Sequence, residues 1–420
     1  MASLRIEGGR ALSGRVTVDG NKNAALPLMA ACLLTDQECV LRNVPRIRDV
    51  EVMAALLADL GATVHGVGTA TLRVQCARVT GDEPDPSLVG KLRGSVLLAG
   101  PLLARRGRAR LADPGGDFPA RRTIATHVQA LTAMGVLADH ERNGHAFDAP
   151  DGLRPASMYL DEASVTGTET ALLAAAAARG RTEIRQSACE PHVVQLCQFL
   201  RQLGVGIEGA GTSTIRVDGG AKLRGADHTL GGDYIEAGSW AVVAAATGSS
   251  IEILGAPARD VEPIVHVLGQ MALRCSVDEG RLVVEPSRLV GARRITTGLW
   301  PGFPSDMVSL ITVLATQAEG RTLVHDWMYE LRLFALEQLS GMHADFFLCD
   351  PHRIIVTGPT ALRGRRLDSR DLRSGMALIA AALAAEGESQ LGPLETVERG
   401  YTAVVDRLQA LGAQVERVAT

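Results

Sequence analysis

Charged residues stand at the starts of several strongly apolar segments of the chain. Lys22 precedes NAALPLMAACLL, Arg93 opens GSVLLAGPLLARRG, and Asp306 opens DMVSLITVLATQAEG. Asp371 and Arg373 both stand just before SGMALIAAALAAEG. An aspartate at a helix start commonly caps the helix, whereas a lysine or arginine there opposes the helix macrodipole. The cations therefore predict an anion held between them.

Two later arginines extend this set of cations. Arg332 lies in MYELRLF and Arg399 in VERGY, where each could instead be a surface arginine paired with a neighbouring glutamate. Asn23 follows Lys22 at the first helix start, where backbone N–H groups can face an anion. Together these residues predict a pocket for phosphate and carboxylate groups where helix N-termini converge.

The stretch ARLADPGGDFPARRT, residues 109–123, carries a further acid. Asp117 follows Pro-Gly-Gly, and Arg121 and Arg122 come soon after it. One interpretation is a hairpin in which Asp117 accepts turn hydrogen bonds. The other is a mobile loop over residues 112–123 that carries an acid toward an anionic substrate, where desolvation would raise the pKa of its carboxyl group.

A repeat of about 70 residues must position these side chains. An amphipathic segment ends six times in a step such as Leu-Gly-Ala, and the aligned positions are Gly61, Gly135, Gly204, Ala272, His343 and Gly412. The apolar segments recur at the same spacing, are rich in small residues, and are too short to span a bilayer. Each repeat therefore predicts a strand, a buried helix, a strand, an exposed helix with a left-handed C-cap, and two closing strands.

Composition excludes several classes of function. A net charge of −4 over 420 residues argues against binding of nucleic acid. The seven cysteines are scattered without a CxxC motif, which predicts reduced thiols in the cytoplasm, with neither disulfides nor a zinc site. Neither a secretion signal nor a membrane span is expected, and the chain lacks GxGxxG and GxxxxGK[ST] motifs for nucleotides.

A series of motifs resembles the UDP-N-acetylglucosamine 1-carboxyvinyltransferase family, relatives of the shikimate-pathway enolpyruvyl synthase. The motifs are collinear over residues 4–417 and include GNKNAALPL, NVPRIRDVE, SVTGTE, EPHVVQLCQFL, WPGFPSDM, YELRLF, DLRSGMAL and ERGY. The resemblance implies an α/β fold of two lobes, each an inside-out α/β barrel of three βαβαββ repeats. Residues 1–21 with 231–420 would form one lobe and residues 22–230 the other, so the backbone would cross between lobes twice.

The resemblance also implies a reaction and a set of site residues. The family transfers the enolpyruvyl group of phosphoenolpyruvate to the 3-hydroxyl of the UDP-sugar by addition and elimination, with no metal or organic cofactor. Carried over by position, phosphoenolpyruvate is assigned Lys22, Arg122, Arg373 and Arg399, and the diphosphate Arg93. Asp306 is implied as the base at the hydroxyl, with Asp371 beside the reacting carbon and Asp117 as a proton donor. The rest of the implied substrate cleft comprises Asn23, Ser164, Val165, Glu190, Met328 and Arg332.

The sequence departs from the family pattern at four positions. Asp117 replaces a cysteine that fosfomycin alkylates in the family, which predicts resistance to that drug. Ala125, Glu162 and Leu331 replace an acid, a lysine and an asparagine near the UDP-sugar. Two alternatives therefore stay open: an enolpyruvyl transferase for another acceptor, such as uridine monophosphate or shikimate 3-phosphate, and a catalytically silent paralogue that binds a nucleotide sugar. We expect a cytoplasmic monomer or weak homo-oligomer.

Overall fold

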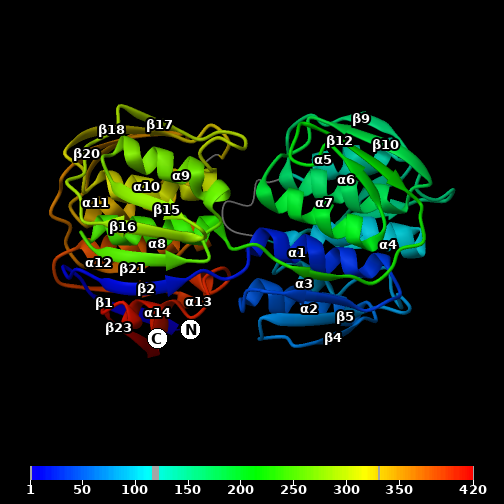
Figure 1. Ribbon diagram of the computed structural model, residues 1–420, viewed down its shortest axis with the longest axis horizontal. Coiled ribbons are helices and arrows are strands. Elements are labelled where there is room, and N and C mark those ends of the chain that lie inside the picture. The colour runs from blue at the N-terminus through cyan, green and yellow to red at the C-terminus, as the bar shows by residue number, and fades with distance from the viewer. Residues whose placement is uncertain (1, 116–122, 330–331, 420) are drawn as a thin grey trace. The chain divides into compact units, whose positions relative to one another are not determined.

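The computed structural model describes residues 2–115, 123–329 and 332–419. The described chain divides into two compact units, each with its own hydrophobic core. Unit 1 comprises residues 2–19 and 232–419, and unit 2 comprises residues 20–115 and 123–231. Figure 1 labels their elements.

Unit 2 contains three sheets around a set of buried helices (Figure 1). The buried helices are α1 (Lys22–Ala31), α4 (Ala99–Arg106), which continues the 3-10 helix η2 (Arg93–Leu98), and α6 (Val165–Ala177). The other helices are η1 (Cys32–Leu34), α2 (Arg48–Asp59), α3 (Pro86–Val89), α5 (Ala125–Ala133) and α7 (Pro191–Leu203). The strands are β3 (Cys39–Arg42), β4 (Thr63–His65), β5 (Thr71–Gln75), β6 (Arg108–Ala112), β7 (Leu137–Glu141), β8 (Gly144–Asp148), β9 (Ser157–Tyr159), β10 (Gly180–Arg185), β11 (Gly206–Glu208), β12 (Thr214–Gly219) and β13 (Asp227–Thr229).

Unit 1 repeats this arrangement. Its buried helices are α8 (Tyr234–Ala246), α10 (Val308–Ala315), which follows the 3-10 helix η3 (Ser305–Met307), and α12 (Leu372–Ala384). The other helices are α9 (Ala258–Gln270), η4 (Arg332–Leu336), α11 (Gln338–Gly341), α13 (Leu394–Val397) and α14 (Val404–Ala410). The strands are β1 (Ala2–Glu7), β2 (Ser13–Thr17), β14 (Ser250–Leu254), β15 (Arg274–Asp278), β16 (Arg281–Glu285), β17 (Arg294–Thr296), β18 (Gly320–His325), β19 (Asp345–Asp350), β20 (Arg353–Gly358), β21 (Arg366–Asp368), β22 (Glu388–Gly392) and β23 (Gln414–Ala419).

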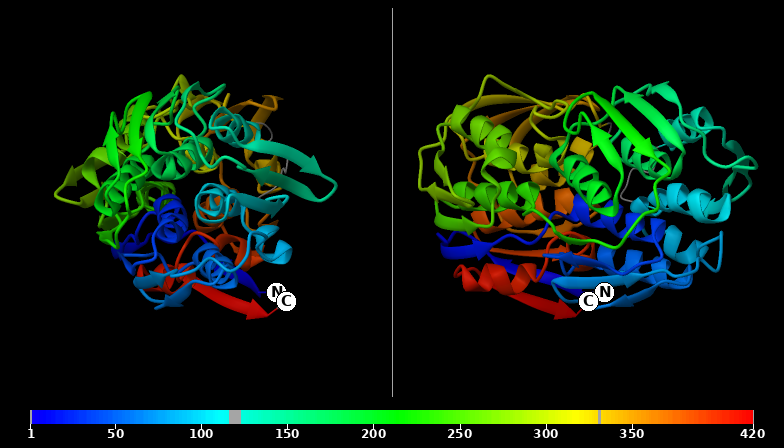
Figure 2. Two further views of the ribbon diagram at one scale, coloured as in Figure 1. Left: turned by 90° about the vertical axis from the view of Figure 1, so that its right-hand side faces the viewer. Right: turned by 45° about the vertical axis from the view of Figure 1, so that its right-hand side comes forward.

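The apolar segments of the sequence form the buried helices, as predicted. Every residue of α8 is buried, and in unit 1 the helices α8, α10 and α12 lie inside the shell of sheets (Figures 1 and 2). Small residues allow this close packing. A Cβ atom added at Gly238 of α8 would lie 2.9 Å from side-chain atoms of both Ile264 and Met307. The helices are therefore enclosed on all sides, and only their ends are placed to meet a ligand.

The six aligned positions of the repeat adopt the same backbone conformation. Gly61, Gly135, Gly204 and Gly412 have φ between 87° and 112°. The two that are not glycine, Ala272 and His343, also have positive φ, at 60° and 69°. The left-handed conformation is therefore a property of the repeat, which confirms the predicted C-cap even where a side chain makes it costly.

Strands far apart in sequence complete several sheets. The sheet orders are β13-β3-β5-β4, β6-β8-β7 and β11-β12-β10-β9 in unit 2, and β15-β16-β14-β2, β17-β18-β20-β19 and β21-β22-β1-β23 in unit 1. β2 pairs in parallel with β14 within unit 1, and β13 pairs in parallel with β3 within unit 2, so each unit brings together strands from distant parts of the chain. The β6-β8-β7 sheet has three strands, whereas the other five have four. One sheet for each repeat confirms the two-lobed α/β fold.

In the last two repeats the predicted exposed helix is divided into two short helices. The sixth repeat forms α13 and α14, separated by a turn in which Ala403 has φ 45°. In the fifth, η4 is followed by α11. Among the described residues, no helix has the length and apolarity needed to cross a bilayer.

Candidate active site

Asp306 lies in η3, directly before α10, and two arginines hold its carboxylate. Oδ1 accepts a hydrogen bond from Nη1 of Arg332 at 3.1 Å. Oδ2 lies 3.1 Å from Nε and 3.0 Å from Nη2 of Arg373, so this guanidinium binds through two nitrogens. The N-cap residues of η3 and α10 are Pro304 and Met307, so Asp306 is the acid of an Arg–Asp–Arg cluster rather than a helix cap.

Both arginines of this cluster are well buried. Burial acts to lower the pKa of the Arg373 guanidinium, but Asp306 and Tyr401 outweigh it and raise that pKa above its ordinary value. Burial also acts to lower the pKa of Arg332, but the negative charge of Asp306 and of other nearby groups outweighs it and raises that pKa. The Arg332 guanidinium also lies 4.3 Å from the centroid of the Tyr329 ring. Both cations therefore keep their charge while they are held in fixed positions.

A chain of hydrogen bonds orients Arg373 from behind. Nη1 of Arg373 donates to the Tyr401 hydroxyl at 3.2 Å, and that hydroxyl lies 2.7 Å from Oγ of Ser239. Because the Ser239 hydroxyl donates to the carbonyl of Ile235 at 2.7 Å, the Tyr401 proton must point to Ser239. Burial raises the pKa of the Tyr401 hydroxyl, so it remains a donor at neutral pH. The guanidinium of Arg373 is thus anchored to the backbone of α8.

Asp326, at the end of β18, organises the loops beside Asp306. It is fully buried and accepts hydrogen bonds from the hydroxyls of Thr297 at 2.9 Å and Ser305 at 2.7 Å. Its Oδ1 also accepts from the backbone N–H of Met328 at 3.3 Å. Asp326 therefore fixes both the residue before Asp306 and the segment that leads to Arg332.

Asp371 is the N-cap of α12. Its Oδ1 accepts from the backbone N–H groups of Arg373 and Ser374, both at 2.9 Å, and its Oδ2 accepts from the Ser374 hydroxyl. The capping alternative raised by the sequence therefore holds for Asp371 and fails for Asp306. Arg399 is half-buried between α13 and α14, and the side chain of Met328 is partly exposed.

In unit 2, Lys22 is the first residue of α1 and forms a buried ion pair. Its Nζ lies 2.8 Å from Oδ2 of Asp49, in the first turn of α2. The carboxamide of Asn21 accepts from the backbone N–H groups of Asn23 and Ala24, at 2.8 and 3.3 Å. The expectation that these N–H groups face an external anion is therefore wrong, since Asn21 already occupies them.

Arg93 opens η2, as predicted, and its Nη2 donates to the carbonyl of Thr123 at 2.7 Å. His127 is buried nearby, with its Nε2 2.9 Å from the hydroxyl of Thr166. Burial, and then the positive charge of Arg93, lower the pKa of His127 to about 4. A neutral His127 therefore lies in the electrostatic field of Arg93.

The other predicted residues of unit 2 stand at helix starts. Ser164 caps α6 by accepting from the N–H of Gly167 at 3.2 Å, and Val165 is the first residue of that helix. Glu190 stands at the start of α7. Burial, and then the charge of Glu190, raise the pKa of Glu169 in α6 well above its usual range. Sequence analysis assigned no role to Glu169, because a glutamate within an apolar segment has no distinctive spacing.

Two departures from the family pattern lie side by side in the structure. Glu162 accepts a hydrogen bond from the hydroxyl of Thr126 at 2.9 Å, and Ala125 directly precedes Thr126 at the start of α5. Two of the positions at which the sequence departs from the family pattern therefore lie beside Thr126. Three predicted or departing residues, Asp117, Arg122 and Leu331, lie outside the described residues.

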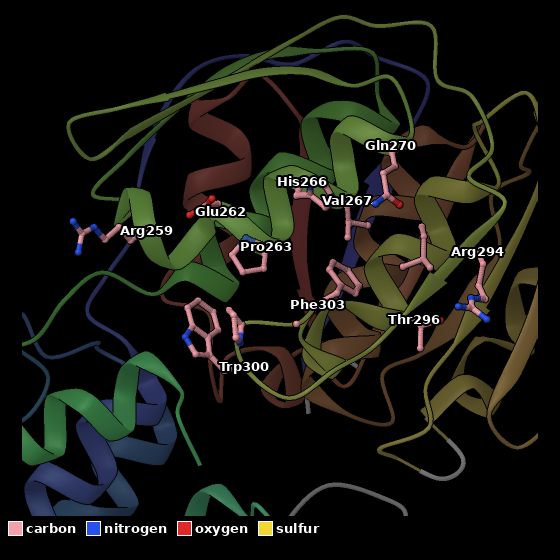
Figure 3. A pocket seen from close by; sticks show the side chains of 13 residues that line it. Arg259, Glu262, Pro263, His266, Val267, Gln270, Arg294, Thr296, Trp300 and Phe303 are labelled. Atoms are coloured by element: carbon pink, nitrogen blue, oxygen red, sulfur yellow. Dashed lines mark hydrogen bonds between the residues drawn. The ribbon is translucent and has the colours of Figure 1, made fainter. Parts of the chain in front are cut away.

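A cavity of about 600 Å³ in unit 1 lies apart from the Asp306 cluster. Residues of α9, among them Glu262, Pro263 and His266, line it together with Trp300 and Phe303 (Figure 3). Of the sequence-predicted site residues that the structure describes, none lines this cavity. Phe303, the last residue of the cavity lining, nevertheless stands three residues before Asp306 in the sequence. The loop that carries Trp300 and Phe303 therefore leads from the cavity to the Asp306 cluster.

Sequence reasoning missed the residues that hold the predicted ones in place. Tyr401 stands in ERGY and Asp326 in VHDW, and Asp49 stands in PRIRDVE. A signal was present in the last two cases, because an acid within or next to an apolar stretch needs a buried partner. Nothing in the sequence identified that partner, which is distant along the chain.

Comparisons with known proteins agree with this geometry. The family model for EPSP synthase (3-phosphoshikimate 1-carboxyvinyltransferase) matches residues 6–408. Proteins named UDP-N-acetylglucosamine 1-carboxyvinyltransferase are 41% identical in Bradyrhizobium diazoefficiens, covering 98% of this chain and 97% of theirs, and 39% identical in Treponema denticola, covering 98% of both. The enolpyruvyl transferase NikO from Streptomyces tendae superposes with a TM-score of 0.88 at 26% identity, covering 100% of this chain and 99% of its own. An EPSP synthase from Acinetobacter baumannii, with a TM-score of 0.77 at 19% identity over both whole chains, shares the fold. The chain therefore belongs to the EPSP synthase family of carboxyvinyltransferases.

Proposed function

We propose that this protein transfers the enolpyruvyl group of phosphoenolpyruvate to the 3-hydroxyl of UDP-N-acetylglucosamine and releases phosphate, the first committed step of peptidoglycan synthesis. The relatives that match almost the whole chain at about 40% identity carry that activity in their names. The single structural observation that supports it best is the Arg332–Asp306–Arg373 cluster. One carboxylate shared by two guanidinium groups combines a base with a binding site for an anion.

The cluster suggests how the base becomes available. Asp306 accepts hydrogen bonds from both arginines, and a carboxylate held in this way is a weak base. The phosphate or carboxylate group of phosphoenolpyruvate presents the same kind of acceptor to the same donors. When substrate binds to Arg373 and Arg332, it competes with Asp306 and leaves that carboxylate to accept a proton.

The proposed reaction then has two stages. Asp306 takes the proton of the acceptor hydroxyl as its oxygen bonds to the central carbon of phosphoenolpyruvate, and Asp117 protonates the methylene carbon. In the second stage a proton leaves the new methyl group, the double bond re-forms, and the phosphate departs. Lys22, Arg93, Arg122 and Arg399 would stabilise the negative charges of the two substrates.

We propose separate roles for the remaining predicted residues. We propose that Asp371, beside the reacting carbon, caps α12 and thereby positions Arg373. Asn23, Ser164, Val165, Glu190 and Met328 remain assigned to the substrate cleft. All seven cysteines are free thiols, which favours a reducing compartment such as the cytoplasm. A monomer or weak homo-oligomer remains our prediction for the assembly.

An acceptor panel tests the proposed function. The purified protein is incubated with phosphoenolpyruvate and one of UDP-N-acetylglucosamine, uridine monophosphate or shikimate 3-phosphate, and phosphate release is followed. We expect phosphate release with UDP-N-acetylglucosamine. The Asp306→Asn variant serves as the matched blank. A higher kcat/KM for another acceptor would transfer the assignment to that acceptor. Absence of release with all three, together with tight binding of the nucleotide sugar, would instead support the silent paralogue.

A further inference from the structure

Two histidines and an aspartate gather at one end of the three-stranded sheet of unit 2. His140 in β7 and His145 in β8 are directly opposite each other in the antiparallel ladder. Asp113 follows the last residue of β6, diagonally across from His145, since Leu111 pairs with His145 and Ala112 with Gly144. The β7–β8 hairpin, coloured between cyan and green, projects from its unit in the left view of Figure 2.

The three side chains present their donor atoms to one another. One nitrogen from each imidazole and one carboxylate oxygen all lie within 4.8 Å of each other. Nε2 of His145 and Oδ1 of Asp113 are 3.5 Å apart, and the two imidazole ring centroids are 4.7 Å apart with the planes at 84°. Two ligands of a tetrahedral Zn²⁺ ion with bonds of 2.0–2.2 Å lie about 3.3–3.5 Å apart. The His145–Asp113 pair already has this separation, and a nitrogen of His140 lies within 4.8 Å of both partner atoms.

The chemistry of the donors suits a transition metal. Imidazole nitrogen with one carboxylate oxygen is a preferred donor set for Zn²⁺, Ni²⁺ and Cu²⁺, whereas Mg²⁺ and Ca²⁺ prefer oxygen alone. His140 and Asp113 are exposed, which leaves an open path for an ion.

We propose that Asp113, His140 and His145 form a binding site for a divalent transition-metal ion of the Zn²⁺ type, with its remaining coordination positions open to water. None of these three residues is among those assigned a role in enolpyruvyl transfer, and the proposal does not depend on that function. A bound ion would connect the end of β6 to the β7–β8 hairpin. The β6-β8-β7 sheet is the one described sheet with three strands, and β6 pairs with a named strand, β8, on one side only. We therefore assign the ion a stabilising role in this sheet.

Direct metal binding tests the proposal. Untagged protein carrying Cys349→Ser, which removes the exposed thiol as a competing ligand, is titrated with Zn²⁺ in the presence of a chromophoric chelator. We expect one Zn²⁺ per chain and a higher melting temperature with Zn²⁺ than with Mg²⁺. His140→Ala, His145→Ala and Asp113→Asn, each in the same background, should weaken binding by roughly tenfold or more and abolish the thermal shift.

Matched controls separate this site from general surface binding. Asp139→Asn removes a carboxylate from the residue next to His140, on the alternate face of β7, and His65→Ala removes an exposed histidine from β4 of the same unit. Both should bind Zn²⁺ as the Cys349→Ser parent does. Equal binding by the parent and by the variants of Asp113, His140 and His145, or failure of the parent to compete with the chelator, would overturn the proposal. Circular dichroism of each variant shows whether a loss of binding reflects a loss of fold.

Discussion

The charged clusters of the two units differ in how many cations share one carboxylate. In unit 1, Asp306 serves both Arg332 and Arg373, and its side chain is 29% exposed. In unit 2, Lys22 has its own partner, Asp49, whose side chain is only 4% exposed. A shared, accessible carboxylate can exchange its partners for a substrate, whereas a buried pair is costly to separate. We therefore propose that Asp306 takes part in the chemistry and that Asp49 holds Lys22 in place.

The largest expected effect is on turnover, in unit 1. Asp306→Asn should reduce kcat by about 10²–10⁴-fold, since it removes a general base. It should also tighten the binding of inorganic phosphate, because the competing negative charge between Arg332 and Arg373 is gone. Steady-state kinetics and calorimetric titration with phosphate measure the two effects.

The control for this variant is Asp350→Asn, in the same unit. Asp350 pairs with Arg353, and its side chain is similarly exposed, at 30%, but it lies on β19 and has no proposed role. Its kcat should match that of the wild type. Weaker phosphate binding in Asp306→Asn would contradict the idea that Asp306 competes with the substrate.

A second large effect tests whether the chemistry also needs the acid outside the described units. Asp117→Asn should reduce kcat by about 100-fold, because the proposed proton donor is lost. Asp117→Cys should retain some activity and become sensitive to fosfomycin, whereas the wild type should resist it. Mass spectrometry after incubation with the drug and dialysis detects the covalent product. An adduct on the wild-type protein, or full activity of the Asn variant, would remove Asp117 from the mechanism.

An intermediate effect on stability should distinguish the buried pair of unit 2. Asp49→Asn should reduce the free energy of unfolding by about 3 kcal/mol, because the charge of Lys22 is left buried without its carboxylate. Asp227→Asn is the matched control, since its pair with Arg42 has a similar length of 2.7 Å but lies on the surface. We expect that control to lose about 0–1 kcal/mol in urea unfolding. Equal losses would show that burial does not set the difference.

The last expected effect appears only as the pH falls and comes from His127, beside Arg93. The pKa of His127 is about 4 in the folded protein, against an ordinary value of 6.5, so the unfolded chain binds its proton first as the pH falls. Stability should therefore decrease by up to about 3 kcal/mol between pH 6.5 and pH 4. His127→Gln should make this decrease smaller, and the exposed His65→Gln should leave it unchanged. Urea unfolding at several pH values measures the slope, and an unchanged slope in His127→Gln would contradict the assignment.

Sequence reasoning predicted what depends on local pattern and missed what depends on long-range pairing. The buried helices follow from their apolar composition, and the six positive-φ positions follow from the repeat, including Ala272 and His343. Charge at the helix starts identified Lys22, Arg93 and Arg373. The same local reasoning could not separate Asp306 from Asp371, because both precede an apolar segment. Only the fold shows that Asp371 meets its own helix and Asp306 meets two arginines.

The internal partners of the cations were likewise beyond local pattern. The sequence predicted an anion near Lys22 and Arg373. It did not show that a carboxylate of the protein already pairs with each of them, Asp49 with Lys22 and Asp306 with Arg373. Asp49 lies on a different helix from Lys22, and Tyr401 lies 28 residues after Arg373. Such partners follow from the packing of helices against each other, which the repeat period does not specify.

The position of β1 has a consequence for the order in which the chain folds. β1 pairs with both β22 and β23, and Ala2 lies opposite Ala419, so the first strand cannot be enclosed until the last one exists. The strands of unit 2 all lie between residues 39 and 229, so that unit can fold on the ribosome while synthesis continues. Unit 1 must instead close a loop that spans nearly the whole chain, which slows its formation more than it weakens the final state. Loss of only the last few residues would leave β1 with an unpaired edge, and newly made chains would then be prone to associate through it.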